Sequence, residues 1–209
     1  MGNIQLTWII LLATVIVSYR GLNDTVLFSK LAGNPYRIKR NKEYYRVFSH
    51  MLLHGDLIHL ALNMFVFYSF GQVFEYYFQE LFGHFSALAF LSLYAGGGVA
   101  GMIPLMKKYG DNPHYTCVGA SGAVSAMIMA YMFEFPLHEI LFFFIPIPAF
   151  LGLIVFFVME RLMQRYSRMP VAHEAHIGGA IFGIAFVVVT HPAALPNFVY
   201  QVSQFLSFQ

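Results

Sequence analysis

Long apolar runs, separated by short polar segments, dominate the pattern of residues along the chain. They predict six helices, at residues 4–19, 57–77, 85–105, 121–135, 139–162 and 175–190, followed by an amphipathic tail at 192–209. The tail places Phe198, Val202 and Phe205 on one helical face, so we expect it to rest on a membrane surface. The first run lacks the basic start and the small-residue cleavage site of a signal peptide, and we interpret it as a retained spanning helix.

The fourth run is too short to cross a bilayer by itself. It begins at Ser121 and stops at Phe135, before Pro136, and about 15 helical residues span roughly 22 Å, whereas a bilayer core measures about 30 Å. Its first turn should therefore start below the membrane surface, with residues 107–116 as an irregular loop beside a watered cavity. The unpaired N–H groups of such a helix start stabilise a developing oxyanion. Ser121 is thus a candidate nucleophile; the alternative is a small-residue packing face.

Composition agrees with the pattern of runs. Of the 209 residues 58% are hydrophobic and 11% charged, and the mean hydropathy is +0.63, which indicates an all-α polytopic membrane protein. Little polar sequence lies between the runs, so we treat residues 1–209 as a single membrane domain. One cysteine, Cys117, excludes an intrachain disulfide and a cysteine-rich metal site. The net charge of +2 is too small to indicate nucleic acid as a partner.

A histidine opens the sixth run, and two glycines follow it at helical spacing. Gly179 and Gly183 are four residues apart and allow two helices to touch. If this face meets the small residues after Ser121, His176 comes level with Ser121 as a Ser–His pair. The alternative is that His176 is merely an interfacial histidine.

The second run carries His59 and Asn63, one helical turn apart. An amide and an imidazole beside a buried serine suit an oxyanion hole, but asparagine in membranes also joins helices, and we weigh the two equally. His50 and His54 share this spacing and with His59 suggest metal ligands.

Carboxylates that would complete either kind of site are scarce. Asp56 and Glu174 are the nearest acids in the sequence, and we place both at the water boundary. We therefore expect a catalytic dyad without a third, acidic member.

These residues together resemble the rhomboid intramembrane serine proteases over nearly the whole six-helix core. The matching segments are Arg46-Val47-Phe48-Ser49-His50, His54, His59-x-x-x-Asn63, Gly119-x-Ser121-Gly122 and Ala175-His176-x-x-Gly179-x-x-x-Gly183. The resemblance implies that Ser121 is the nucleophile and His176 the general base. It implies an oxyanion hole of His59, Asn63 and the Ser121 and Ala120 amides, with Arg46, His54 and Glu75 as structural polar groups. Tyr45 and Ser125 depart from the family pattern, which often has a tryptophan at the first position and an aromatic residue packed on the histidine at the second.

The function predicted on this basis is hydrolysis of a peptide bond in or beside the transmembrane segment of another membrane protein. The reaction would pass through an acyl-enzyme on Ser121 and require neither metal nor cofactor. The partners would be transmembrane substrates and the lipid bilayer, and the helix at 139–162, interrupted by Pro146 and Pro148, is a candidate gate. Two rivals are a metallohydrolase built on His50, His54, His59 and His176 and a non-catalytic rhomboid-like binder of transmembrane helices; substrate identity and oligomeric state stay open.

Two arguments on membrane orientation disagree. By our helix count all twelve Lys and Arg lie in connections on the Ser121 side, so the positive-inside rule places that side in the cytoplasm. The family resemblance implies the opposite, a bacterial inner membrane with the active site facing away from the cytoplasm. We keep the family orientation as the hypothesis.

Overall fold

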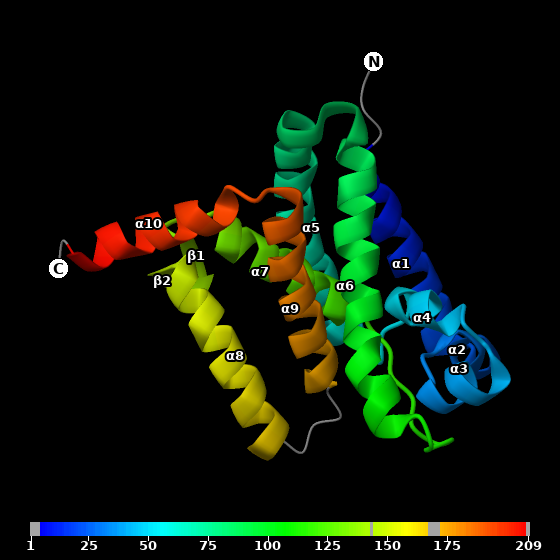
Figure 1. Ribbon diagram of the computed structural model, residues 1–209. Helices are drawn as coiled ribbons and strands as arrows, with labels where there is room; N and C mark the ends of the chain where they lie inside the picture. The colour runs from blue at the N-terminus through cyan, green and yellow to red at the C-terminus, as the bar shows by residue number, and fades with distance from the viewer. Residues whose placement is uncertain (1–4, 143, 167–171, 208–209) are drawn as a thin grey trace.

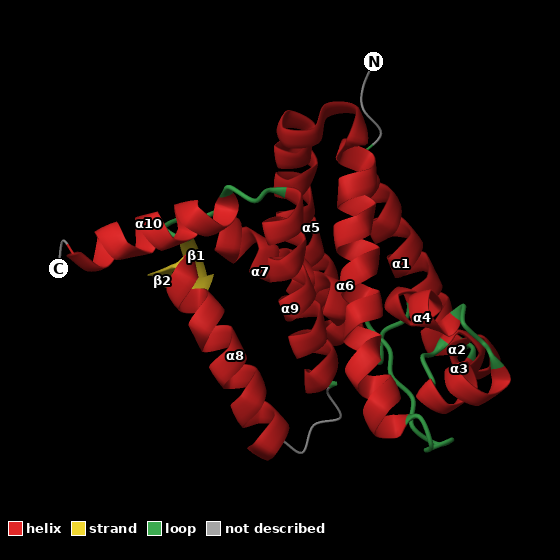
Figure 2. Cartoon of the chain, viewed as in Figure 1, coloured by secondary structure: helices red, strands yellow, loops and turns green. Residues whose placement is uncertain are grey.

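The computed structural model describes residues 5–142, 144–166 and 172–207 of the chain. This part is mostly helical (Figures 1 and 2). In chain order its elements are α1 (Leu6–Asn23), α2 (Thr25–Leu31), α3 (Pro35–Asn41), α4 (Arg46–Ser49), η1 (His50–Leu52), α5 (Leu57–Phe82), η2 (Gly83–Phe85), α6 (Ser86–Tyr109), α7 (Ser121–Glu134), β1 (Glu139–Phe142), β2 (Ile145–Pro148), α8 (Ala149–Tyr166), α9 (His173–Thr190) and α10 (Ala194–Ser207). The first residue of the predicted helix 4–19 and the last two of the predicted tail lie outside the described residues.

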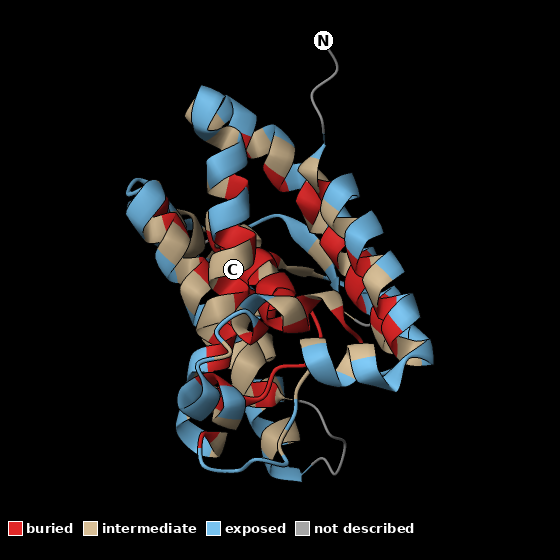
Figure 3. Ribbon diagram, turned by 90° about the vertical axis from the view of Figure 1, so that its right-hand side faces the viewer, coloured by how far each residue is buried: buried red, intermediate tan, exposed pale blue. Residues whose placement is uncertain are grey.

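Three stretches among the described residues are long and apolar enough to cross a membrane. They are Leu6–Asn23, His173–Thr190 and Leu57–Tyr109, the last of which comprises α5 and α6. Large apolar side chains on these helices face outward, including Phe65, which is 70% exposed, and Val189, which is 76% exposed. Figure 3 shows the exposed positions along the outer faces of the helices and the buried ones inside. Such outward apolar faces suit contact with lipid.

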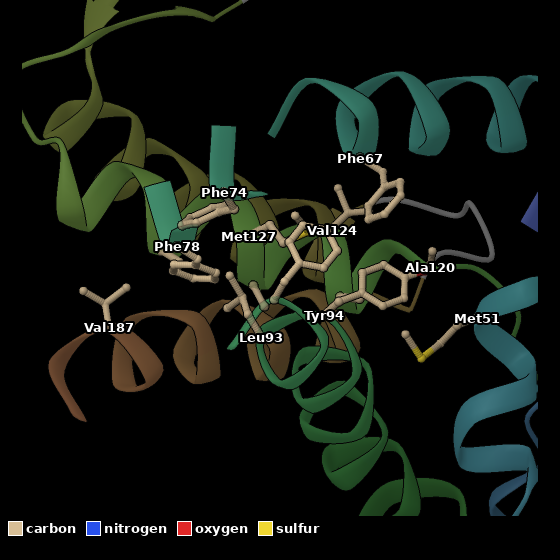
Figure 4. Packing of buried hydrophobic residues seen from close by; sticks show 14 of the residues in the cluster. Met51, Phe67, Phe74, Phe78, Leu93, Tyr94, Ala120, Val124, Met127 and Val187 are labelled. Carbon is tan, nitrogen blue, oxygen red and sulfur yellow. The ribbon is translucent and has the colours of Figure 1, made fainter. Parts of the chain in front are cut away.

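Helix α7 forms the centre of the bundle and packs against α5, α6 and α9. Ten of its fourteen residues are buried, as expected for a helix that is apolar on all sides. Around it, Phe67 and Phe74 of α5 and Leu93 of α6 join Val124 and Met127 of α7 in the main hydrophobic core (Figure 4).

The backbones of α7 and α9 are in direct contact because two glycines of α9 face α7. A Cβ atom placed on Gly179 would lie 2.0 Å from the carbonyl oxygen of Gly122, and one on Gly183 would lie 2.0 Å from that of Ala126. Real Cβ contacts are essentially never under 3.0 Å, so only glycine fits at these two positions. This contact fixes the position of α7 along its axis relative to α9.

The prediction of a continuous helix at residues 139–162 is wrong at its start. Strands β1 and β2 form an antiparallel hairpin, with Glu139 opposite Pro148 and Ile140 opposite Ile147, and α8 begins only at Ala149. Proline has no backbone N–H and clashes with the preceding turn of a helix, whereas the isoleucine and phenylalanine residues of this segment favour strands. The all-α description therefore needs this small two-stranded exception.

The long connection between α1 and α5 is fastened by a buried arginine. Arg46 is 2% exposed and its guanidinium donates to the backbone oxygens of Ser29 and Ala32, at 2.8 and 2.7 Å, and to Glu43 at 2.5 Å. Thr7 of α1 donates to Glu75 of α5 at 2.7 Å, in a second polar contact that joins these two helices. These bonds satisfy polar groups that would otherwise be costly to bury.

This connection also anchors the loop that leads to Ser121. Gly33 and Cys117 exchange two backbone hydrogen bonds of 2.9 Å, and the Gly119 N–H donates to the His50 carbonyl oxygen at 3.0 Å. Three backbone hydrogen bonds thus hold the loop before α7 at Cys117 and Gly119, which places the first residue of α7 at a defined point in the bundle.

The tail predicted to lie on the membrane surface is helix α10 (Ala194–Ser207), which turns away from α9 and extends outward past the β hairpin and the start of α8 (Figure 1). Phe198 stacks on Phe133 of α7 with ring centroids 4.8 Å apart, and Phe205 contacts Phe150 of α8. Part of its apolar face therefore packs on the protein itself.

Candidate active site

Ser121 and His176 meet where α7 and α9 begin. Ser121 is the first residue of α7, and its Oγ lies 2.7 Å from Nε2 of His176, in the first turn of α9. The contact follows from the close packing of Gly179 on Gly122, each within one turn of these side chains. An imidazole nitrogen at this distance from a hydroxyl is placed to take its proton.

A carboxylate lies on the far side of the His176 ring. Oε1 of Glu160, from α8, is 2.9 Å from Nδ1 of His176, and its Oε2 is 2.7 Å from Nδ1 of His173. Because an ionised carboxylate only accepts hydrogen bonds, we assign the proton of His176 to Nδ1, which leaves the Nε2 lone pair facing Ser121. The expectation that no acid would accompany the Ser–His pair is therefore wrong: the acid is Glu160, and neither Asp56 nor Glu174 takes that position.

His54 is fully buried beside the loop that precedes Ser121. The Ser18 hydroxyl donates to the Leu52 carbonyl at 2.8 Å, so its oxygen accepts from Nδ1–H of His54 at 2.9 Å. Nε2 of His54 then accepts the Ala120 N–H at 3.4 Å. Burial lowers the pKa of His54 to about 3, so the ring is neutral. The Ala120 amide, expected in the oxyanion hole, points to His54 in this structure.

The His59 ring and the Ser121 hydroxyl both lie beside Gly119. Gly119 has φ +121°, a conformation that other residues rarely adopt, and a Cβ atom there would lie 3.1 Å from Nε2 of His59 and 3.7 Å from Oγ of Ser121. The Gly55 N–H donates to Nδ1 of His59 in a long contact of 3.5 Å, which assigns the ring proton to Nε2. The donor of His59 therefore faces the space beside the Ser121 hydroxyl.

Asn63 is one turn farther along α5 and is 8% exposed. Its Nδ2 donates to the His59 carbonyl at 3.0 Å within the helix. An amide nitrogen carries two hydrogens, so a second donor is left for another acceptor.

The described residues bring together one group of side chains with the geometry of metal ligands, Glu160, His173 and His176. Of the four histidines proposed for the rival metallohydrolase, this group contains only His176. Nδ1 of His50 lies 3.1 Å from the carbonyl oxygen of its own turn, on Arg46, and His54 is occupied as described above.

Sequence reasoning missed both Glu160 and His173. The available signal for Glu160 was its position directly after the apolar run Leu151–Met159, in a predicted membrane helix. An ionisable group inside a membrane helix is a functional candidate by default.

The fold and site define a class of helical membrane proteins in which a serine and a histidine meet at the starts of two packed helices. The family model of the rhomboid domain matches residues 41–193. The chain therefore belongs to the rhomboid family, which includes serine proteases, and is an integral multi-pass membrane protein. The resemblance noted from the sequence is confirmed.

Among curated proteins, the chain is similar to the presenilin-associated rhomboid-like protein, mitochondrial, of Homo sapiens, Mus musculus and Bos taurus. Each is 27% identical over 148 residues, which cover 69% of this chain and 37% of the relative. The aligned part is thus little more than a third of the length of these relatives.

Proposed function

We propose that this chain is an intramembrane serine endopeptidase with a six-transmembrane-helix core, and that it cleaves transmembrane segments of other membrane proteins. The observation that carries the proposal is the 2.7 Å contact between Oγ of Ser121 and Nε2 of His176. Membership of the rhomboid family supports it. No step of the proposed reaction draws on a metal or a cofactor.

In the proposed reaction Oγ of Ser121 attacks the scissile carbonyl carbon while Nε2 of His176 takes the hydroxyl proton. The tetrahedral intermediate then breaks its C–N bond, and His176 returns the proton to the leaving amine. A water molecule repeats the sequence on the acyl-enzyme and frees Ser121. Glu160 positions the ring through Nδ1 and stabilises the imidazolium formed in each half-reaction.

The negative charge on the carbonyl oxygen would be met by donors from two elements. Nε2–H of His59 and the second N–H of Asn63 come from α5, and the Ser121 amide belongs to the first turn of α7, where N–H groups have no partner within the helix. Donors fixed in place before the reaction lower the barrier most, since they need no reorganisation.

A transmembrane substrate must unwind before its backbone reaches Ser121. Segments with Gly, Ser or Pro near one end unwind at the lowest cost, so we propose these as preferred substrates. They would approach past α8, whose buried residues Ala149, Phe150 and Gly152 all belong to its first turn. Leu153, Phe156 and Phe157 also pack against the bundle, but no later residue of α8 does so within the described clusters, and this second half of α8 suits a gate.

The test is cleavage of a model transmembrane substrate by the purified chain reconstituted in liposomes. Ser121→Ala and His176→Ala should each abolish cleavage, and the double variant should lose no more than either, because the two groups act as a unit. A fluorophosphonate probe should label the wild type but not Ser121→Ala. Ser69→Ala is the matched control, because Ser69 is exposed on α5 and its hydroxyl donates to the Phe65 carbonyl of its own helix.

Substantial activity in either single variant would contradict the proposal. So would loss of activity on treatment with a zinc chelator together with resistance to the fluorophosphonate, which would instead favour the metallohydrolase.

A further inference from the structure

Behind the Ser–His pair, the Glu160 carboxylate joins two histidines of α9. Glu160, His173 and His176 each offer one ligand atom, and these atoms lie within 4.8 Å of one another. The two histidines are three residues apart, on one face of the first turn of α9, and the carboxylate reaches them from α8. Helices α8 and α9 thus bring three possible metal-ligand atoms close together.

The donor set is the one that zinc prefers in sites with an open position. Zn²⁺ binds imidazole nitrogen and carboxylate oxygen at about 2.0–2.2 Å, and two histidines with one glutamate form a common three-ligand set. Ligand atoms around a tetrahedral ion at that distance lie about 3.4 Å apart. The present N–O contacts of 2.7 and 2.9 Å need to open by about 0.7 and 0.5 Å to reach this separation.

His173 has no part in the proposed proteolysis, yet it is 7% exposed and turned toward Glu160. Its Nε2 is buried without a hydrogen-bond partner among the described residues. An ion bound at Nδ1 would leave this Nε2 without a partner as well, so the case for a ligand rests on the other ring nitrogen. Nδ1 of His173 faces the same carboxylate as Nδ1 of His176, which places both nitrogens to bind one ion beside Glu160.

We propose that Glu160, His173 and His176 form a site for a divalent transition metal ion, Zn²⁺ above all, whose occupation switches the active site off. The inhibitory half of this inference rests on the proposed function; the binding half does not.

Inhibition follows from the positions of protons on the His176 ring. In the free site Nδ1–H donates to Glu160 and the lone pair of Nε2 faces Ser121. A metal ion bound at Nδ1 uses the lone pair of that nitrogen, so the proton of the neutral ring moves from Nδ1 to Nε2, and no proton is released overall. Nε2–H then donates to Oγ of Ser121 and has no lone pair to accept the serine proton. Glu160, held by the ion, also stops positioning the ring.

Two features set the strength of binding. The site lies at the start of α9, where the helix dipole disfavours a cation, and the neighbouring Glu174 is paired with Lys108, so it adds no free negative charge. Because the site has only three protein ligands and the dipole of α9 opposes a cation, binding should be reversible and weaker than in four-ligand structural zinc sites.

The first experiment measures binding without any need for proteolysis. The full-length Ser121→Ala chain, purified in detergent without a polyhistidine tag and stripped with chelator, is titrated with Co²⁺ and competed with Zn²⁺. We expect one ion per chain with the visible absorption of low-coordinate cobalt. Adding His173→Gln should weaken binding by at least about tenfold, whereas His173→Cys, which keeps a ligand, should retain it. His114→Gln is the matched control because His114 is exposed in the loop before α7.

The second experiment measures inhibition. Zn²⁺ should reduce substrate cleavage by the otherwise wild-type chain, and chelator should restore it. For each variant, the cleavage rate is expressed relative to its own rate without metal. The zinc concentration that halves this rate should rise at least about tenfold in His173→Gln and stay unchanged in His114→Gln.

Absence of Co²⁺ binding by Ser121→Ala, or equal binding after His173→Gln, would overturn the site. Binding that leaves cleavage unchanged would overturn its inhibitory role. Failure of the proposed function has a different signature: the chelator-treated wild type would not cleave, although the ion still binds.

Discussion

The contact between α7 and α9 makes a sharp prediction for Gly179→Ala. The new Cβ atom would lie 2.0 Å from the carbonyl oxygen of Gly122, and bringing it to 3.0 Å requires the two backbones to separate by about 1 Å. Because His176 is one turn before Gly179 and Ser121 directly precedes Gly122, this movement lengthens the 2.7 Å contact of the site. A misplacement of about 1 Å costs about 10² in rate, and overpacking costs about 1–3 kcal/mol of stability.

The assay separates these two effects. The cleavage rate per folded molecule is measured on liposomes, and the free energy of unfolding is followed by circular dichroism in detergent. Gly183→Ala provides an internal comparison, since it makes the same 2.0 Å contact with Ala126 one turn farther from the site. We expect it to destabilise the chain by a similar amount and to slow cleavage less. Gly55→Ala is the control, because nothing lies within 4 Å of a Cβ atom there.

Two results would refute the reasoning. One is a Gly179→Ala chain that is fully folded and cleaves at the wild-type rate, which would mean that the helix contact does not set the geometry of the Ser–His pair. The other is a Gly183→Ala chain slowed as much as Gly179→Ala at equal stability.

Three further predictions concern the polar groups and the orientation. Asn63→Ala should lower kcat by about 10²–10³ with little change in KM, as for loss of one oxyanion donor; a lower melting temperature with normal turnover per folded molecule would show that Asn63 only joins helices. Glu160→Gln should lower kcat by between about 10 and 10⁴, the upper figure being that for the neutralised carboxylate of a Ser-His-Asp triad, and unchanged kcat would exclude a positioning role. A reporter active only outside the cytoplasm, fused after Gln209, should stay inactive in the family orientation, and strong activity would place the Ser121 side in the cytoplasm.

The spacing of small residues explains why the Ser–His pair was predictable from the sequence. A short apolar run after Ser121 and glycines at i, i+4 after His176 both indicate helices that pack closely and begin on the same side. The 2.7 Å contact is what this arrangement produces. The direction of the Ala120 amide was not predictable in the same way, because it depends on a hydrogen bond to His54, 66 positions earlier in the chain.

In the segment after α7 the hydropathy pattern does not distinguish a helix from a strand hairpin. An apolar run of this length has the same mean hydropathy whether it forms one helix or a hairpin followed by a helix. Pro146 and Pro148 favour the hairpin, because each proline in a helix interior costs about 3 kcal/mol, and α8 starts directly after the second of them. The hairpin shifts the start of the helix by ten residues from the predicted position, from residue 139 to Ala149.

Glu160 joins the chemistry of the site to the position of α8. Beyond its first turn α8 buries no residue, so little apolar contact holds its second half to the bundle. Polar contacts join this half of α8 to α9 instead: the two hydrogen bonds of Glu160, to His173 and His176, and a hydrogen bond between Gln164 and Glu174. If α8 moves outward to admit a substrate, the carboxylate leaves His176, and the ring loses the partner that fixes its tautomer. The Ser–His pair would then be fully positioned only after α8 returns, so chemistry would follow closure of the bundle around the substrate.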